Sequence, residues 1–450
     1  MPAPSHSRRL HLALHFLAGG LLAGTAFVPR VLPDLALAWL GWSRWLVPLG
    51  TILALSGFLT HRPPIAGLAQ GLCVASTSLM LLLAGLESLF RVARYDFNRM
   101  EARLRQLPPF FRKPLVPTGP VFFRRAGPER WTGRVLTTAL AQQGIRPDAY
   151  PAEPAITVVY DALGFREETG RTNWTVSVAG DSFTELGHLP FDQLFTTRLG
   201  QELRRPVRNL GVSHTGPLTH LHYLETYGLT PATRDAVIVF FEGNDPEDLA
   251  REYDALARWS ATGQRPPRGR RPQTSLLRAI HDAWQRHRTE PVPVSSPPNA
   301  WFNGPTGPQP VTVSTPRGPV ADLPPVTLNA LDDFLTRYAA LGQRHGLAPR
   351  LVYLPAKETV WRNHLTFAAA PPEGWNSTPP TDLPDHLAQR CVATGVLFLD
   401  LTPILRAKTD AGRELLYNGL YDTHLNQRGA EVVANALARW LQPASPSAPP

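Results

Sequence analysis

The sequence predicts an α/β fold, in which a parallel sheet of five strands is covered by helices on both faces and is preceded by an α-helical transmembrane region. From about residue 154 onward, short apolar runs alternate with segments of helical length. Strands that are apolar throughout are typical of parallel sheets buried on both faces. Of the 450 residues, 43% are hydrophobic and 18% are charged, which excludes a disordered chain.

Residues 1–92 are predicted to form a membrane anchor with two or three transmembrane helices. Residues 10–28 contain no Asp, Glu, Lys or Arg, and Glu87 is the only charged residue within 65–90. A helix over 10–28 would be about 28 Å long at about 1.5 Å per residue, which nearly spans the hydrocarbon layer of a bilayer. Residues 31–60 either span the membrane or dip back into it, and we favour three spans over two.

The basic residues that flank the anchor give conflicting signals about its orientation. Arg8 and Arg9 favour a cytoplasmic amino terminus, whereas three arginines soon after the last span favour the opposite. Because the positive-inside rule weights short loops and the first helix most, we expect the remaining chain to lie outside the cytoplasm, anchored in the cell inner membrane. An even number of spans would reverse this orientation.

The rest of the chain is predicted to comprise a connector and one folded domain. Residues 93–153 read as a charged helix followed by a proline-punctuated stalk, and residues 154–443 as the α/β domain. A Pro/Arg-rich insertion at about 257–325 shows no repeat or strand alternation of its own and is expected to be partly ordered, and 444–450 is expected to be a disordered tail. The predicted strands are residues 175–179, 207–210, 236–241, 350–354 and 396–401. The predicted helices are residues 191–205, 328–345 and 427–441.

Polar motifs stand at the ends of the predicted strands. A Gly-Asp-Ser tripeptide ending at Ser182 follows the first strand, and Gly211 follows the second. Asn244 follows the third strand, while Asp422 and His424 precede the last helix. A Gly-Asp-Ser tripeptide alone is more often a helix-capping turn, but the carboxyl ends of parallel strands meet at one edge, where open α/β sheets place their binding sites. Four polar motifs at this edge therefore indicate a functional site.

These residue types match the chemistry of a nucleophilic serine. A serine hydroxyl reacts once an imidazole accepts its proton and a carboxylate holds that imidazole in the right tautomer, roles that fit Ser182, His424 and Asp422. A tetrahedral intermediate also needs hydrogen-bond donors for its oxyanion. The candidate donors are the backbone N–H groups of Ser182 and Gly211 and the side-chain amide of Asn244.

In this order the motifs resemble those of the SGNH hydrolase family, also called GDSL esterases and lipases, whose four named residues are Ser, Gly, Asn and His. The resemblance extends over about residues 161–440. It implies a flavodoxin-like three-layer α/β/α fold and ester chemistry through a covalent acyl-serine. The positions that correspond to the four named residues are Ser182, Gly211, Asn244 and His424.

The chain departs from the family pattern at two places. Glu242 stands where the third motif usually has glycine, two places before the asparagine. Asp422 lies two residues before His424, whereas the usual separation is three, a place held here by Tyr421. The Asp-x-His pair also resembles that of alginate O-acetyltransferase-like SGNH proteins, although there it precedes the serine. We therefore carry over the chemistry of that branch but not its substrate.

Other polar residues near the strand ends have plainer interpretations. Asp181 and Asp245 are expected to cap the segments that follow them, and Glu242 to be an exposed residue at the end of a strand. Lys357 follows the fourth strand and either contacts an anionic substrate or, as we favour, lies on the surface. None of these four residues is assigned a catalytic role.

Composition and spacing exclude several classes of function. The net charge is +9, but only three of the 45 basic residues are lysines and the arginines are scattered, so no nucleic-acid partner is predicted. Two cysteines provide neither a disulfide framework nor a zinc site. Four histidines near the first two strand ends lack the spacing of metal ligands and are expected to be exposed or capping, so no metal or cofactor is predicted. These histidines are His188, His214, His220 and His222.

The favoured function is a serine-dependent esterase that removes acyl groups from an acylated cell-envelope carbohydrate or a small ester, with the lipid bilayer as a second partner. An O-acetyltransferase with a membrane acyl-donor partner is the first alternative, because hydrolysis and transfer share the acyl-enzyme and differ in the acceptor. A non-catalytic, membrane-tethered polysaccharide-binding or assembly protein is the second, since a fold does not fix function. A lipase is less favoured because the Pro/Arg-rich insertion would make a poor apolar lid.

Overall fold

The computed structural model describes most of the chain from residue 108 onward. The described ranges are 108–114, 116–142, 153–168, 170–263, 298–367, 369–420 and 422–442, with isolated helical positions between 71 and 89. Among these residues, no helix combines the length and the apolar character needed to cross a membrane. The predicted spans at 10–28 and 31–60, most of 65–90 and the predicted tail at 444–450 lie outside the described residues.

The chain divides into two compact units, and nearly all described residues belong to the second, formed by 107–266 and 291–450. A five-stranded sheet lies at the centre of this unit, with the strand order β12-β10-β7-β5-β6, and every neighbouring pair is parallel. The predicted parallel sheet is therefore confirmed. Its strands are β5 (Val176–Gly180), β6 (Val207–Gly211), β7 (Asp235–Phe241), β10 (Ala348–Leu354) and β12 (Leu397–Asp400).

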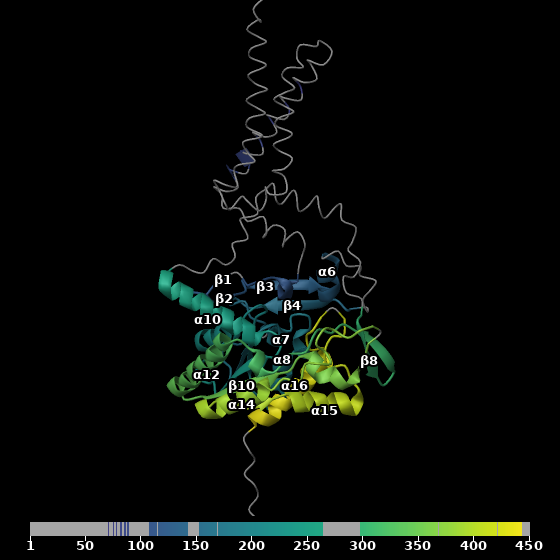
Figure 1. Cartoon of the computed structure of the whole chain (residues 1–450). Coiled ribbons are helices and arrows are strands. Elements are labelled where there is room, and N and C mark those ends of the chain that lie inside the picture. The colour runs from purple at the N-terminus through teal and green to yellow at the C-terminus, as the bar shows by residue number, and fades with distance from the viewer. Residues whose placement is uncertain are drawn as a thin grey trace, which may run out of the picture. The chain divides into compact units, whose positions relative to one another are not determined.

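Helices cover both faces of the sheet and form a separate hydrophobic core on each (Figure 1). Alternate side chains of the central strand β7 point to opposite faces, so Val237 and Val239 enter one core while Ala236 and Ile238 enter the other. The first core contains α8 (Phe195–Leu203), α13 (Lys357–Trp361), α15 (Thr402–Gly412) and α16 (Gln427–Leu441). The second contains α9 (Pro217–Tyr223), α10 (Asp245–Thr262), α12 (Pro325–His345) and α14 (Leu383–Thr394).

Residues 108–142 do not form the predicted stalk but fold with the sheet-bearing unit. Strand β3 (Glu129–Gly133) pairs antiparallel with β4 (Ile156–Tyr160), across the boundary that we predicted at residue 154. Helix α6 (Val135–Gln142) follows β3, and the two-residue strands β1 (Val116–Pro117) and β2 (Phe123–Arg124) precede it. The boundary was misplaced because prolines around these short strands conceal their alternation in the sequence.

The predicted insertion at 257–325 contains two strands, although its sequence shows no strand alternation. Helix α10 continues to Thr262, and the strands β8 (Ala300–Gly304) and β9 (Gly307–Val311) form an antiparallel hairpin that β11 (Leu365–Thr366) extends. Two prolines, Pro308 and Pro310, lie in β9, which is an edge strand of this small sheet. Proline is tolerated at a sheet edge, so a proline-rich sequence does not exclude a strand there.

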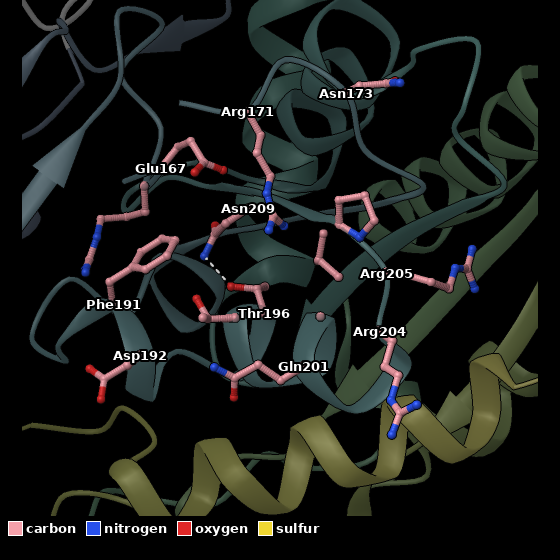
Figure 2. Close-up of a pocket in the computed structure, with 15 residues that line it drawn as sticks. Glu167, Arg171, Asn173, Phe191, Asp192, Thr196, Gln201, Arg204, Arg205 and Asn209 are labelled. Atoms are coloured by element: carbon pink, nitrogen blue, oxygen red, sulfur yellow. Dashed lines mark hydrogen bonds between the residues drawn. The ribbon is translucent and has the colours of Figure 1, made fainter. Parts of the chain in front are cut away.

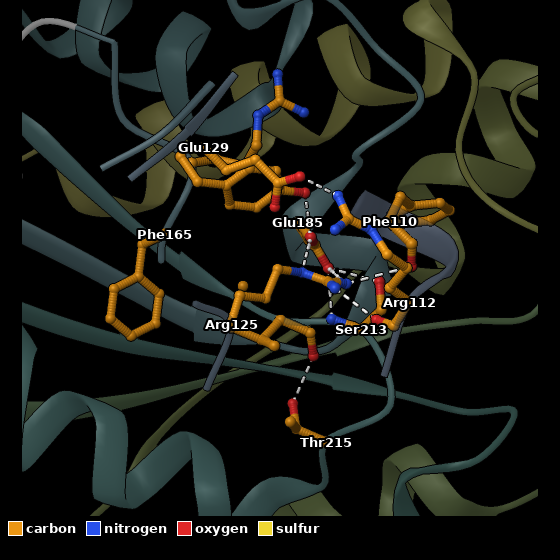
Figure 3. Close-up of polar contacts among 12 residues, drawn as sticks. Phe110, Arg112, Arg125, Glu129, Phe165, Glu185, Ser213 and Thr215 are labelled. Carbon is orange, nitrogen blue, oxygen red and sulfur yellow. Dashed lines mark hydrogen bonds and ion pairs between the residues drawn. The ribbon is translucent and has the colours of Figure 1, made fainter. Parts of the chain in front are cut away.

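A buried ion pair joins the amino-terminal segment to the sheet. Arg125 Nε lies 2.6 Å from Glu185 Oε1, and Arg125 Nη2 lies 2.9 Å from Glu185 Oε2 (Figure 3). Tyr160 of β4 donates a hydrogen bond to the same carboxylate, and Ser213, after β6, donates both its N–H and its hydroxyl. Burial alone raises the pKa of Glu185, but Arg125 and the hydrogen bonds outweigh burial and hold the pKa below its usual value.

We predict that Arg125→Met lowers the free energy of unfolding by about 3–5 kcal/mol at neutral pH, because it leaves a buried carboxylate without its countercharge. Denaturant unfolding measures the loss, with the exposed Arg130 as control through Arg130→Met. The pKa of Glu185 is lowered in the folded protein. The ion pair therefore stabilises the folded state above about pH 4.3, and its contribution to the free energy of unfolding falls as the pH decreases. The deficit of the variant should therefore shrink in acid, and a deficit independent of pH would contradict this account.

Candidate active site

Ser182 lies directly after the carboxyl end of β5 and begins the short helix α7 (Ser182–Glu185). Asp181 caps this helix, as predicted, because its carboxylate accepts a hydrogen bond from Phe183 N at 2.8 Å. A Cβ atom at Gly180 would lie 2.1 Å from Thr184 Oγ1, so only glycine permits this tight turn. Within the described residues, the Ser182 N–H has no hydrogen-bond partner.

Asp422 and His424 form a nearly buried hydrogen-bonded pair. Asp422 Oδ1 lies 2.5 Å from His424 Nδ1, and the two side chains are 8% and 13% exposed. The loop turns tightly enough for contact at two-residue separation, because Asn418 N donates to His424 O at 2.8 Å and Tyr417 forms a β-bridge with Leu425. Tyr421, at the usual aspartate position, lies outside the described residues.

The pair is electrostatically suited to hold a proton. Burial lowers the pKa of His424, but the Asp422 carboxylate outweighs burial and raises the pKa above its usual value. Burial raises the pKa of Asp422, and His424 with the hydrogen bond from Asn418 reverses this effect and holds the pKa far below its usual range. The carboxylate therefore stays ionised and stabilises an imidazolium.

Two phenylalanines enclose the imidazole. The ring of Phe183, which follows Ser182, lies 4.5 Å from that of His424, and the ring of Phe110 meets His424 edge-on at 4.9 Å. His424 Nε2 is buried and has no partner within the described part of the chain. This nitrogen is the one that a general base would use, since Nδ1 is engaged by Asp422.

Two of the three predicted oxyanion donors, Gly211 N and the Asn244 amide, already donate hydrogen bonds to other groups of the protein. Gly211 N already donates to Asn209 Oδ1 at 2.8 Å, so the structure does not present it as a free donor. Gly211 is needed instead for close packing, because a Cβ there would lie 2.2 Å from Glu185 N. Asn244 is brought near Ser182, but its amide donates to Asp181 Oδ2 at 3.3 Å and Asp248 Oδ2 at 2.7 Å.

Three other expectations about polar residues are corrected. Lys357 is 4% exposed rather than superficial, and its Nζ donates to the Asp422 carbonyl oxygen at 2.8 Å. Glu242 is fully buried, and its Oε2 accepts from Ala356 N at 3.0 Å. Asp245 is also buried and accepts from Phe241 N, a residue before it rather than after it.

The histidines show no metal site within the part of the chain that the structure describes. His188 lies beside His424, with ring centroids 5.7 Å apart, and burial lowers the pKa of His188 to about 4. His220 is fully buried rather than exposed or capping and contacts Thr215 Oγ1. His214 is exposed as expected. Phe110 and His188 were missed as parts of the site because neither stands in a motif.

A separate cavity of about 900 Å³ lies beside the edge strand β6 and helix α8 (Figure 2). Ser182, Asp422 and His424 do not line it. Asn209 lines the cavity and donates to Thr184 O at 2.9 Å, which connects its floor to α7. The Asp422–His424 pair, and not this cavity, marks the candidate site.

The described residues form an α/β domain that has Ser182 shortly after the carboxyl end of a parallel strand and a buried Asp422–His424 pair. Residues 327–449 match the family model of an SGNH hydrolase-like domain, that of acetyltransferase AlgX. The matched segment includes Asp422 and His424 but not Ser182. The match supports the predicted resemblance to the SGNH family and to its alginate-acetyltransferase-like branch over this segment, which is less than half of the chain.

Solved structures show weaker likeness. An acetyl xylan esterase is 12% identical in sequence to this chain, with a TM-score of 0.31. The alignment covers 60% of this chain and 100% of the esterase chain. A member of the lipolytic protein G-D-S-L family from Veillonella parvula DSM 2008 is 10% identical with a TM-score of 0.26, covering 59% and 97%. TM-scores this low support no conclusion on activity or substrate. The curated proteins contain no match to this chain.

We predict that Asp422→Asn lowers kcat by about 10³–10⁴-fold with little change in KM, because the amide cannot stabilise the imidazolium. Asp422 raises the pKa of His424, so kcat/KM of the wild type should rise with pH to an inflection above pH 6.5. Without the carboxylate, burial dominates, and the inflection should move to lower pH. Turnover of p-nitrophenyl acetate across pH measures both effects.

The control for this prediction is Asp385→Asn, at an exposed position of α14. A loss below about tenfold in Asp422→Asn would transfer the orienting role to another carboxylate. Asp181, whose charge also raises the pKa of His424, is the first candidate.

Proposed function

We propose that the chain is a serine-dependent O-deacylase that acts on an acylated cell-envelope carbohydrate through an acyl-serine intermediate. The observation that carries this proposal is the Asp422–His424 pair, whose Nε2 has no partner among the described residues and whose imidazole contacts the ring of Phe183, the residue after Ser182. Such a pair has a specific use, because it converts a hydroxyl of ordinary reactivity into a nucleophile.

The proposed reaction has two halves. Ser182 Oγ attacks the ester carbonyl while His424 Nε2 accepts its proton, and the collapsing intermediate releases the sugar hydroxyl with that proton. Water then attacks the acyl-serine, His424 again accepts a proton, and the carboxylic acid leaves as Ser182 is restored. The unpartnered Ser182 N–H is the first oxyanion donor, and Asn244 joins it once its amide turns from Asp181.

Transfer to a second sugar hydroxyl is the competing function, and the match to an acetyltransferase domain favours it specifically. In that case an acceptor hydroxyl replaces water in the second half, and a membrane protein supplies the acyl donor. A non-catalytic polysaccharide-binding or assembly role is the remaining alternative. The apolar stretches 10–28 and 65–90 support anchoring of the enzyme in the inner membrane, and a third span within 31–60 would place its site outside the cytoplasm.

We predict that Ser182→Ala reduces turnover of p-nitrophenyl acetate by about 10⁶-fold without unfolding the protein, because it removes the nucleophile. Mass spectrometry of the wild type after brief incubation with this ester should find one acetyl group on Ser182. Undiminished turnover in the variant would exclude the serine mechanism. Adding an oligosaccharide separates the two enzyme functions, since a transferase acetylates it while a hydrolase releases acetate.

We further predict that a chain starting at residue 96 is soluble without detergent and keeps the esterase activity, because the apolar stretches precede this residue. A chain starting at residue 126 lacks Phe110 and Arg125 and should lose activity and stability. Sedimentation and turnover of both forms provide the measurement. Equal activity of the two would show that the segment before residue 126 plays no part in the site.

A further inference from the structure

The loop that carries Asp422 and His424 rests on a buried ammonium group. Lys357 Nζ donates to the carbonyl oxygen of Asp422 at 2.8 Å and lies 3.4 Å from that of Asn418. The same Nζ lies 5.7 Å from the centre of the Trp361 ring, on the next turn of α13. A buried charge is stable only where polar groups replace its lost hydration, and these carbonyls and the ring supply that replacement.

The two carbonyls lie four residues apart in the segment that leads to His424. Asn418 also donates its side-chain amide to Asp422 Oδ2, so the residue beneath the turn and the carboxylate are tied together. Lys357 therefore binds the loop at two points, one of them the backbone of Asp422 itself. Loss of the ammonium would leave two partly buried carbonyls without this donor and allow the loop to relax.

Lys357 is in turn fixed by Glu242, the residue that departs from the family's usual glycine. Glu242 Oε2 accepts from Ala356 N at 3.0 Å, and Oε1 accepts from Thr359 Oγ1 at 2.5 Å. These bonds hold both sides of Lys357 at the start of α13. A third tie joins the same regions, because Tyr417 OH donates to Pro355 O at 2.7 Å.

We propose that Lys357, anchored through Glu242, is a positioning residue that holds the catalytic loop so that Asp422 orients His424. It touches neither substrate nor reacting atom and acts only through the loop carbonyls. This role rests on the proposed serine mechanism for its effect on turnover, but its effect on the Asp422–His424 hydrogen bond does not require turnover. The two ideas can therefore fail separately.

The test compares Lys357→Met with the wild type in full-length protein. Methionine keeps the length and apolar stem of lysine but donates no hydrogen bond. We expect kcat for p-nitrophenyl acetate to fall about 10²-fold with KM nearly unchanged, as for a catalytic group displaced by about 1 Å. The control is Lys408→Met. Lys408 Nζ lies 3.6 Å from Glu414 Oε1 and both side chains are partly exposed, so this variant should keep the wild-type kcat.

Proton NMR provides the second readout. The short Asp422–His424 hydrogen bond should give a downfield resonance in the wild type, identified by its absence in His424→Ala. The resonance should weaken or disappear in Lys357→Met while the melting temperature shows a folded protein. Should Lys357→Met not fold, Lys357→Gln, which retains a side-chain donor, replaces it and is expected to show the same changes to a smaller degree.

The anchoring step is tested by a double-mutant cycle. Glu242→Gln should lower kcat, and combining it with Lys357→Met should add little further loss, because both act on one chain of contacts. Additive losses would show that Glu242 acts independently, and would overturn the anchoring step. A folded Lys357 variant with wild-type kcat and an unchanged resonance would overturn the proposal as a whole. Turnover that survives Ser182→Ala would instead reject the serine mechanism and leave the resonance test valid.

Discussion

The carboxylate of Glu185 is the point on which the candidate site depends. It lies one turn of helix after Ser182, and it is bound by Arg125 before the sheet, Tyr160 of β4 and Ser213 after β6. A fully buried carboxylate is tolerated only with a countercharge and saturated hydrogen bonds, so these segments are held in place together. The position of the serine is thus set by contacts from three other parts of the chain.

A second constraint acts on the histidine. Asp422 supplies the negative charge that a buried imidazolium needs, and the rings of Phe110 and Phe183 exclude water around it. In a site of low polarity this charge pair is stronger than it would be in water, which raises the pKa of His424 against the effect of burial. The enclosure is consistent with a His424 Nε2 that is buried and has no partner among the described residues.

The central sheet could be predicted because its strands are largely apolar, and Asp422 could be paired with His424 because they are near neighbours in sequence. Phe110 and Arg125 could not be predicted, since each contacts the site through residues 60 or more positions away and neither stands in a recognisable pattern. Lys357 was placed on the surface because lysine is rarely buried, a rule that fails where carbonyls and an aromatic ring surround the ammonium. The β8–β9 hairpin was missed because proline conceals edge strands.

The departures from the family pattern have a common physical consequence. A glycine at position 242 would leave the N–H of Ala356 and the hydroxyl of Thr359 without the acceptor that Glu242 provides. Both donors flank Lys357 in the sequence. Lys357 in turn donates to the carbonyl oxygen of Asp422, which stands only two residues before His424. A shorter aspartate-to-histidine separation requires a tighter turn. Such a turn is stabilised when a neighbouring side chain donates hydrogen bonds to its backbone carbonyls, as Lys357 does. The buried glutamate and lysine supply this support, so the unusual spacing and the unusual residue at position 242 belong to one arrangement.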